Sequence, residues 1–390
     1  MLNIDTVGRS TQARRLLVEG LRQAGTIQSE SVAQAFLSIP REAFVSSFFE
    51  QEKFVWTVHT PDGYTPDAWI DAIYRDTALV TLIDERNYPA SSSSAPAAMA
   101  MMLEALVVRP GMRVLEIGTG TGYNAAVLAY LVGDPALVTT IDVEEFLARS
   151  AQQALEAVIG PVRVLVGDGY HGVPLHAPYD RIIVTASAST IPATWYEQLA
   201  SDGCLVMILQ GSLQKSGLLV IKKQTNGCAS GRFDPRYLCF MPMRSGPRAS
   251  SSVRSLLQQP VVQRIVQENN EMATDLFGNA DFHWFLQWAV PGMTMAKAKM
   301  KAKDGISFIP FMTMVDAQKS TIVQLYLRGS MWSGHERGHG GLWETMRQVY
   351  QEWMSLGKPD QSAYYVEWNQ QNARFQLFCE HEKGVRSFDL

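Results

Sequence analysis

The sequence predicts an α/β fold built on a parallel, doubly wound sheet. Short apolar strands alternate with helices between residues 112 and 209. A glycine-rich turn follows the first of these strands, and Asp142 and Asp168 stand at the ends of the next two. Alternating strands and helices favour parallel pairing with right-handed crossovers. Ligands of such sheets bind beyond the carboxyl ends of the strands, so the turn and the two aspartates predict a binding site at one edge of the sheet.

Helices and loops are expected ahead of the sheet. Leucines spaced among charged residues predict an amphipathic helix over residues 10–24. Ser29 is suited to cap a second helix over residues 29–38. Residues 55–89 are expected to be rich in loops, and an apolar helix over residues 97–108 follows four consecutive serines.

The sheet and the chain beyond it are expected to form separate domains, because residues 245–252 are typical of a linker. Strands of the sheet are expected at 112–117, 137–141, 163–166, 181–185 and 204–209, with helices at 124–131, 144–159 and 195–200. Beyond the linker we expect strands at 307–315 and 321–327, a helix at 342–356, and a hairpin of 364–368 with 374–379. The domains expected are an N-terminal helical and loop segment (1–90), a ligand-binding sheet domain (91–245) and a C-terminal α+β extension (246–390).

Composition excludes several classes of protein. The 390 residues carry a net charge of −4, without the basic surplus that nucleic-acid binding needs. No run of about 18 apolar residues is present to span a membrane. The four cysteines have long, irregular spacings that match neither a zinc site nor a disulfide framework. We therefore expect a cytoplasmic protein that has no nucleic-acid partner, no membrane partner and no metal.

The glycine turn, which reads Gly118-Thr119-Gly120-Thr121-Gly122, predicts a nucleotide-like ligand. Glycines let the backbone approach a ligand closely, and the following helix offers free N–H groups. On the turn alone a dinucleotide and S-adenosylmethionine are equally compatible, since Gly120, Gly122 and Ala125 also form the pattern G-x-G-x-x-A. Glu116 before the turn and Asp168 after the third strand favour S-adenosylmethionine. Glu116 would face its ammonium, Asp142 its ribose hydroxyls and Asp168 its adenine.

Six motifs occur in order over residues 30–245. They are Ile39-Pro40-Arg41-Glu42-Ala43-Phe44-Val45, Ser94-Ala95-Pro96, Val114–Gly122, Val166-Gly167-Asp168-Gly169, Ala177-Pro178-Tyr179-Asp180 and Met241-Pro242-Met243. In this order the motifs resemble those of the protein L-isoaspartyl (D-aspartyl) O-methyltransferase family. The resemblance implies a Rossmann-like class I methyltransferase that uses S-adenosylmethionine to methylate a carboxylate of a peptide or protein. The cofactor-binding residues it implies are Ser91, Ser92, Glu116, Gly118, Thr119, Gly120, Gly122, Asp142, Val143, Asp168 and Gly169.

The acceptor side of the site is expected around the serine run. A carboxylate is already ionised near neutral pH and needs no general base, which fits the absence of a Ser-His-Asp or Cys-His set. The resemblance places Ser94, with Ser93 beside it, next to the acceptor as hydrogen-bonding positioners rather than nucleophiles. The alternative for Ser94 is a helix cap before Pro96. Ser92 and Ser93 replace the family's Thr-Ile pair, which changes the expected substrate preference.

About 145 residues follow Met243, and this length resembles the longer members that tailor ribosomally made peptides. The leading hypothesis is methylation of an aspartate side chain that then closes to a succinimide and can hydrolyse to isoaspartate, with the extension docking the peptide. The rival is repair of isoaspartate in damaged proteins. A nucleic-acid methyltransferase, a dehydrogenase and a non-catalytic cofactor-binding protein are further alternatives. A nucleic-acid methyltransferase is disfavoured because Thr185–Ser189 lacks the (Asp/Asn)-Pro-Pro-aromatic motif of enzymes that methylate exocyclic amines.

Three patterns in the extension suggest a function but are better explained by structure. His335-Glu336-Arg337-Gly338-His339 matches a zinc-protease motif, but the surrounding glycines disfavour the helix that the motif needs, and a loop is expected there. Alternating lysines at 297, 299, 301 and 303 are typical of a solvated face, and attraction of an acidic peptide is the alternative. Aromatic residues between 282 and 288 are expected in the core of the extension, and a peptide groove is the alternative.

Overall fold

The computed structural model describes residues 4–53, 55–244, 256–268, 271–301, 308–328, 331–382 and 384–390. The chain divides into two compact units. Unit 1 comprises residues 1–208, 218–231 and 236–245, and unit 2 comprises residues 209–217, 232–235 and 246–390. Among the helices of the described residues, none combines the length and the apolarity needed to cross a bilayer.

Unit 1 is organised around a mixed sheet with the expected parallel centre. Its strands follow the order β11-β10-β9-β8-β5-β6-β7, in which β6 and β8 both run parallel to β5, and β7 runs parallel to β6. The strands are β5 (Val114–Ile117), β6 (Val138–Asp142), β7 (Arg163–Val166), β8 (Tyr179–Ala188), β9 (Leu199–Gln210), β10 (Ser216–Lys223) and β11 (Ala229–Phe233). The parallel centre of this sheet, with the helices described next, is the doubly wound α/β arrangement that the sequence predicts.

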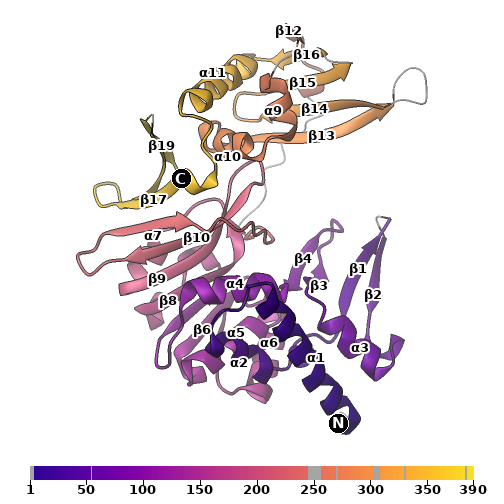
Figure 1. The fold of residues 1–390 in the computed structure, drawn as a ribbon, viewed down its shortest axis with the longest axis vertical. Helices are drawn as coiled ribbons and strands as arrows, with labels where there is room; N and C mark the ends of the chain where they lie inside the picture. The colour runs from indigo at the N-terminus through magenta and orange to yellow at the C-terminus, as the bar shows by residue number, and fades with distance from the viewer. Residues whose placement is uncertain are drawn as a thin grey trace. The chain divides into compact units, whose positions relative to one another are not determined.

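Helices pack against the strands of this sheet and build the core of unit 1. They are α4 (Pro96–Leu106), α5 (Tyr123–Val132), α6 (Glu145–Val158) and α7 (Ala193–Gln198), preceded by α1 (Ile4–Gln23) and α2 (Glu30–Ser38). Nine of the ten α5 residues are buried, because α2 and α6 pack against this helix. Ser29 caps α2 by accepting a hydrogen bond from the Val32 amide, as predicted. Figure 1 shows α2 beside α5, and α1 packs in turn against α2.

The expectation that residues 55–89 are mainly loops was wrong. This stretch contributes β2 (Val55–His59), α3 (Pro66–Ile73), β3 (Leu79–Ile83) and the start of β4 (Pro89–Ser93). Together with β1 (Phe48–Glu52), the strands form an antiparallel sheet in the order β2-β1-β3-β4. These strands are half-exposed and interrupted by polar residues, so their apolar pattern is weak, and long-range pairing stabilises them instead.

Unit 2 is an α+β arrangement. A five-stranded sheet has the order β12-β16-β15-β14-β13, and β17, β18 and β19 form antiparallel hairpins. The elements are β12 (Val261–Glu268), α9 (Glu271–Gly278), α10 (Ala280–Ala289), β13 (Met293–Lys301), β14 (Phe308–Asp316), β15 (Thr321–Arg328), β16 (Met331–Gly338), α11 (Leu342–Ser355), β17 (Tyr364–Asn369), β18 (Arg374–His381) and β19 (Gly384–Asp389). The aromatic residues of α10 are buried, as expected for a core.

The loop expected around His335 is instead strand β16, which pairs with β15 and β12. Gly334 permits this pairing, because a Cβ there would lie 1.9 Å from the Gln324 carbonyl oxygen. Glu336 is buried and accepts hydrogen bonds from the Leu342 and Trp343 amides, which caps α11. An extended strand separates residues four apart by about 13 Å, so the zinc motif is not formed. The expected linker and Lys303 lie outside the described residues.

Candidate active site

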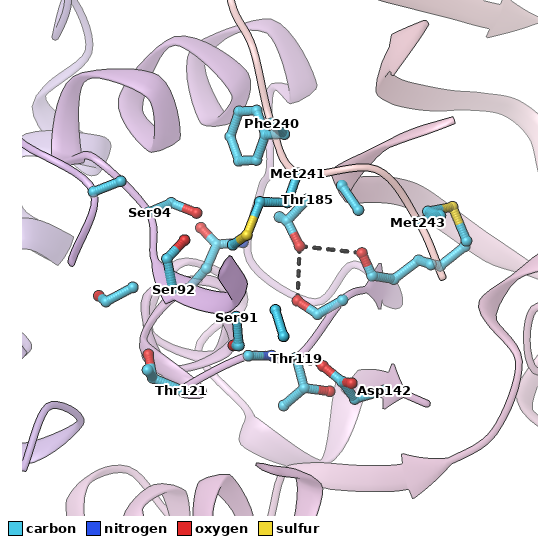
Figure 2. A pocket seen from close by; sticks show the side chains of 18 of the residues that line it. Ser91, Ser92, Ser94, Thr119, Thr121, Asp142, Thr185, Phe240, Met241 and Met243 are labelled. Atoms are coloured by element: carbon cyan, nitrogen blue, oxygen red, sulfur yellow. Dashed lines mark hydrogen bonds between the residues drawn. The ribbon is translucent and has the colours of Figure 1, made fainter. Parts of the chain in front are cut away.

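A cavity of about 360 Å³ lies in unit 1 at the carboxyl ends of β5 and β6. Most of its lining comes from four segments, which we call the serine strand (89–94), the glycine turn with the end of β5 (116–121), the end of β6 (141–143), and the segment 239–244. Figure 2 labels members of each. Ten of the predicted site residues fall in the first three: Ser91, Ser92, Ser93, Ser94, Glu116, Gly118, Thr119, Gly120, Asp142 and Val143. Gly169 also lines the cavity, whereas its lining does not include Gly122 or Asp168.

The glycine turn holds a backbone shape that side chains would block. Gly118 has φ +101°, and a Cβ there would lie 2.8 Å from the Thr185 hydroxyl oxygen. That hydroxyl donates toward two carbonyl oxygens of the turn, those of Ile117 at 3.1 Å and Gly118 at 2.7 Å. Thr185, which the sequence analysis did not select, therefore fixes the turn from β8.

Gly120 joins the glycine turn to the serine strand. Its φ is +52°, and a Cβ there would lie 3.3 Å from the Ser92 carbonyl oxygen and 3.7 Å from Ser91 Oγ. Any larger residue would push the two walls of the cavity apart. The sequence separates these walls by nearly thirty residues, and only the fold shows that they touch.

Asp142 lies at the end of β6, as predicted, and organises two backbone segments. One carboxylate oxygen accepts from the Gly120 amide at 2.9 Å, and the other accepts from the Glu144 amide at 3.0 Å. Each carboxylate oxygen has a second lone pair. The side chain can therefore shape the turn and still accept hydrogen bonds from a ligand's hydroxyl groups.

Glu116 lies at the end of β5 and is fully buried. Its two carboxylate oxygens accept hydrogen bonds from the Asn124 amide at 2.7 Å and the Thr140 hydroxyl at 2.6 Å. Burial raises the pKa of Glu116 to about 7, and these two hydrogen bonds oppose the rise. Among the described residues, the buried Asn124 Oδ1 has no hydrogen-bond partner. A buried acceptor beside a buried carboxyl favours a ligand that brings N–H donors or positive charge.

Ser91, Ser92 and Ser93 form the end of strand β4, and Ser94 directly follows the strand. Ser94 does not cap the following helix, because Ala95 occupies the N-cap position of α4. The amide of Ala97 donates instead to Asp76 Oδ1 at 2.8 Å. Figure 2 shows Ser92 and Ser94 beside the cavity on the side away from Asp142. The helix-cap alternative for Ser94 is therefore wrong.

Residues 239–244 supply a wall that the sequence analysis did not treat as part of the site. The segment is held to β8, since the Ser187 amide donates to the Met241 carbonyl and the Met243 amide donates to the Ser187 carbonyl. Figure 2 shows Phe240 and Met241 facing the cavity. Arg244 also lines it and pairs with Glu144 at 2.5 Å. The Met241-Pro242-Met243 motif was the available signal for this wall.

The predicted residues outside the cavity lining have structural contacts. Asp168 caps a short turn by accepting from the Tyr170 amide at 2.9 Å, and it directly precedes Gly169. Gly122 has φ +87° and begins α5, where a Cβ would lie 3.0 Å from Ala151 Cβ. No group of three or more potential metal-ligating side chains occurs within the described part of the chain.

Comparisons with known proteins agree on one family. Residues 12–246 match the family model described as Protein-L-isoaspartate(D-aspartate) O-methyltransferase. A protein-L-isoaspartate O-methyltransferase of Pyrobaculum islandicum is 35% identical over 230 residues, which are 58% of this chain and 97% of the relative. One of Thermotoga maritima is 37% identical over 188 residues, 48% of this chain, and the chain spans about half (53%) of that relative's length.

A solved structure of a protein-L-isoaspartate O-methyltransferase resembles most of the chain. The two share 26% sequence identity with a TM-score of 0.54, over 94% of this chain and 99% of the other. The match therefore extends beyond residue 246 and includes part of unit 2.

Proposed function

Since this chain belongs to the protein-L-isoaspartate(D-aspartate) O-methyltransferase family, we propose that its cavity binds S-adenosylmethionine and directs the methyl group to a carboxylate of a peptide or protein. The observation that carries the proposal is that two walls of different chemical character line the same cavity. The wall of the glycine turn and Asp142 suits a nucleoside-like ligand, and the serine wall suits an anionic acceptor.

The donor wall fits S-adenosylmethionine at three points. The glycine turn allows close approach of the backbone. Asp142 has lone pairs for ribose hydroxyls, and Glu116 with Asn124 Oδ1 forms an acceptor pair for an ammonium group. When bound, S-adenosylmethionine supplies an electrophilic methyl group, which a carboxylate oxygen takes as the carbon–sulfur bond breaks.

The acceptor wall positions the incoming carboxylate. We assign the Ser94 hydroxyl to donate a hydrogen bond to one oxygen of the acceptor, which leaves the other oxygen directed at the methyl group. Ser93 supports this arrangement through the backbone. Such alignment, with exclusion of water, is the main source of rate where no proton needs to be removed.

We propose further that the acceptor is an aspartate side chain of a peptide. The support is the replacement of the family's Thr-Ile pair by Ser92 and Ser93, in the strand that lines the cavity. In the methylated aspartate, the amide nitrogen of the next residue attacks the ester carbonyl, methanol leaves with the amide proton, and a succinimide forms. Water can then open the succinimide to isoaspartate.

Isoaspartate is the second candidate acceptor, and a specific observation favours it. The solved structure that covers 94% of this chain is itself a protein-L-isoaspartate O-methyltransferase. The length of the chain beyond residue 246 therefore does not by itself favour peptide tailoring. The acceptor wall is the feature that separates the two candidates.

The test uses three peptides of one sequence with aspartate, isoaspartate or asparagine at a single position. Each is incubated with the protein and methyl-labelled S-adenosylmethionine, and products are identified by mass spectrometry and base lability. Net loss of one water from the aspartate peptide supports the proposed acceptor. Base-labile label on the isoaspartate peptide alone overturns it in favour of repair. Label on the asparagine peptide, or on none, contradicts carboxyl methylation of these peptides.

A further inference from the structure

We infer that Arg41 is a positioning residue that holds the acceptor wall in place, an inference that rests on the proposed function. Arg41 belongs to a short 3-10 turn, η1 (Arg41–Ala43), and it is fully buried. The cavity lining does not include it. Its guanidinium instead donates to the backbone carbonyls of Ser93 and Ser94, two residues that do line the cavity.

The guanidinium contacts two separate parts of the chain. Toward the acceptor wall, Nη2 donates to the carbonyl oxygens of Ser93 at 3.2 Å and Ser94 at 3.0 Å, and Nε donates to Ser93 Oγ at 3.3 Å. In the other direction it donates to three carbonyl oxygens between α3 and β3. These are Ile73 at 2.8 Å, Arg75 at 3.0 Å and Thr77 at 3.0 Å.

The chemistry of these partners explains why arginine stands here. All six acceptors are neutral carbonyl or hydroxyl oxygens, and a guanidinium presents five N–H donors in a rigid plane. Burial lowers the pKa of Arg41 to about 10, so the group remains charged near neutral pH. A lysine has one nitrogen with three donors and cannot reach both parts of the chain at once.

The position of these contacts gives Arg41 a role in turnover rather than in donor binding. The two carbonyls that it holds flank the Ser94 hydroxyl along the backbone. The donor wall is fixed separately, by Asp142 and Thr185. Loss of the guanidinium therefore releases the acceptor wall and leaves the donor wall in place.

The experiment compares Arg41→Lys and Arg41→Gln with Arg75→Gln and Phe36→Leu. Arg75 is a nearby, half-exposed arginine whose side chain pairs with Glu50. Phe36 is a buried α2 residue outside the cavity lining, and its substitution controls for loss of stability. Four quantities are measured: kcat and KM with the peptide that wild type methylates, the dissociation constant for S-adenosylhomocysteine, and hydrogen exchange of residues 91–95. Hydrogen exchange is measured with saturating S-adenosylhomocysteine, because a ligand bound to the folded state stabilises it.

We expect kcat to fall about 100-fold in both Arg41 variants, the size of effect that small misplacements of reacting groups produce. The dissociation constant is expected to stay within about threefold of wild type, and exchange is expected to rise at residues 91–95 but not at 118–122. The inference is overturned if Arg41→Lys keeps wild-type kcat and exchange, or if Phe36→Leu lowers kcat equally. If wild type methylates no peptide, the proposed function fails, and hydrogen exchange still decides whether Arg41 holds residues 91–95.

Discussion

The two walls of the cavity, to which we assign the donor and the acceptor, are built in different ways. The donor wall is a continuation of the parallel sheet, and its contacts come from neighbouring strand ends: Asp142 follows β6, and Thr185 lies in β8. The acceptor wall is the edge strand of a separate antiparallel sheet, and a guanidinium 52 residues away in sequence holds it. The comparison therefore predicts that donor binding and acceptor alignment can be altered independently, except at Gly120, where the two walls meet.

Asp142→Ala is expected to have the largest effect that is confined to one wall, a loss of donor affinity. The variant loses the ribose acceptor and leaves the Gly120 amide without its partner. Hydrogen bonds to charged groups contribute about 1.5–3 kcal/mol, so we expect S-adenosylhomocysteine to bind roughly 10- to 100-fold more weakly by calorimetry. Glu145→Ala, an exposed acid three residues away, serves as the control. Unchanged affinity in Asp142→Ala would remove Asp142 from the donor site.

Ser94→Ala tests the acceptor wall alone. Removal of the hydroxyl deletes one hydrogen bond to the charged acceptor, worth about 1.5 kcal/mol at the lower end of the range for charged partners, and we expect kcat to fall roughly tenfold. The affinity for S-adenosylhomocysteine should stay as in wild type. Ser31→Ala, on the exposed surface of α2, is the matched control. A loss of donor affinity without a loss of kcat would contradict the assignment of Ser94 to the acceptor.

The protonation of Glu116 offers a test of the donor wall by pH. Its raised pKa of about 7 means that the carboxyl is mostly neutral at pH 5.5 and half ionised at pH 7. The ammonium of the ligand stays protonated over this range, so ionisation of Glu116 should strengthen binding. We expect the association constant for S-adenosylhomocysteine to rise roughly tenfold from pH 5.5 to 7.0. Glu116→Gln should abolish the rise, and an equal rise in that variant would contradict the pairing.

The smallest expected effect is that of Arg244→Gln. Arg244 lines the cavity, but its ion pair with Glu144 is more than a third exposed on both sides. Exposed pairs contribute about 0–1 kcal/mol, so we expect donor affinity and kcat to change by no more than about twofold. Raising the salt concentration should change the donor affinity and the kcat of wild type by a similarly small factor. A tenfold loss of kcat would instead give Arg244 a direct role with the acceptor.

The sequence was enough to predict which residues of the proposed donor wall meet at one cavity, because the signals for them are local. The glycine turn, Asp142 and Glu116 each lie at the end of an apolar strand whose pattern is plain. The role of Thr185 was not predicted, because its contact with the glycine turn depends on the pairing of β8 with β5, which no local pattern specifies. The contacts of Ser187 with the segment 239–244 could not be predicted for the same reason.

The acceptor wall was predicted only in part. Family motifs indicated Ser94 and included Arg41, but no spacing in the sequence relates Arg41 to Ser93. The four-stranded sheet that carries the serines was missed because its strands are short and half-exposed. In unit 2, β16 was missed because the glycines around His335 are typical of a loop, although Gly334 is what lets the backbones approach.

The most direct test of the two-wall account is a crystal structure of the protein with S-adenosylhomocysteine and the aspartate peptide. The account predicts the ribose on Asp142, the ligand's amino group toward Glu116 and Asn124, and the acceptor carboxylate against Ser94. A ligand bound away from the Gly118–Gly120 turn, or a peptide carboxylate far from the serine strand, would contradict it.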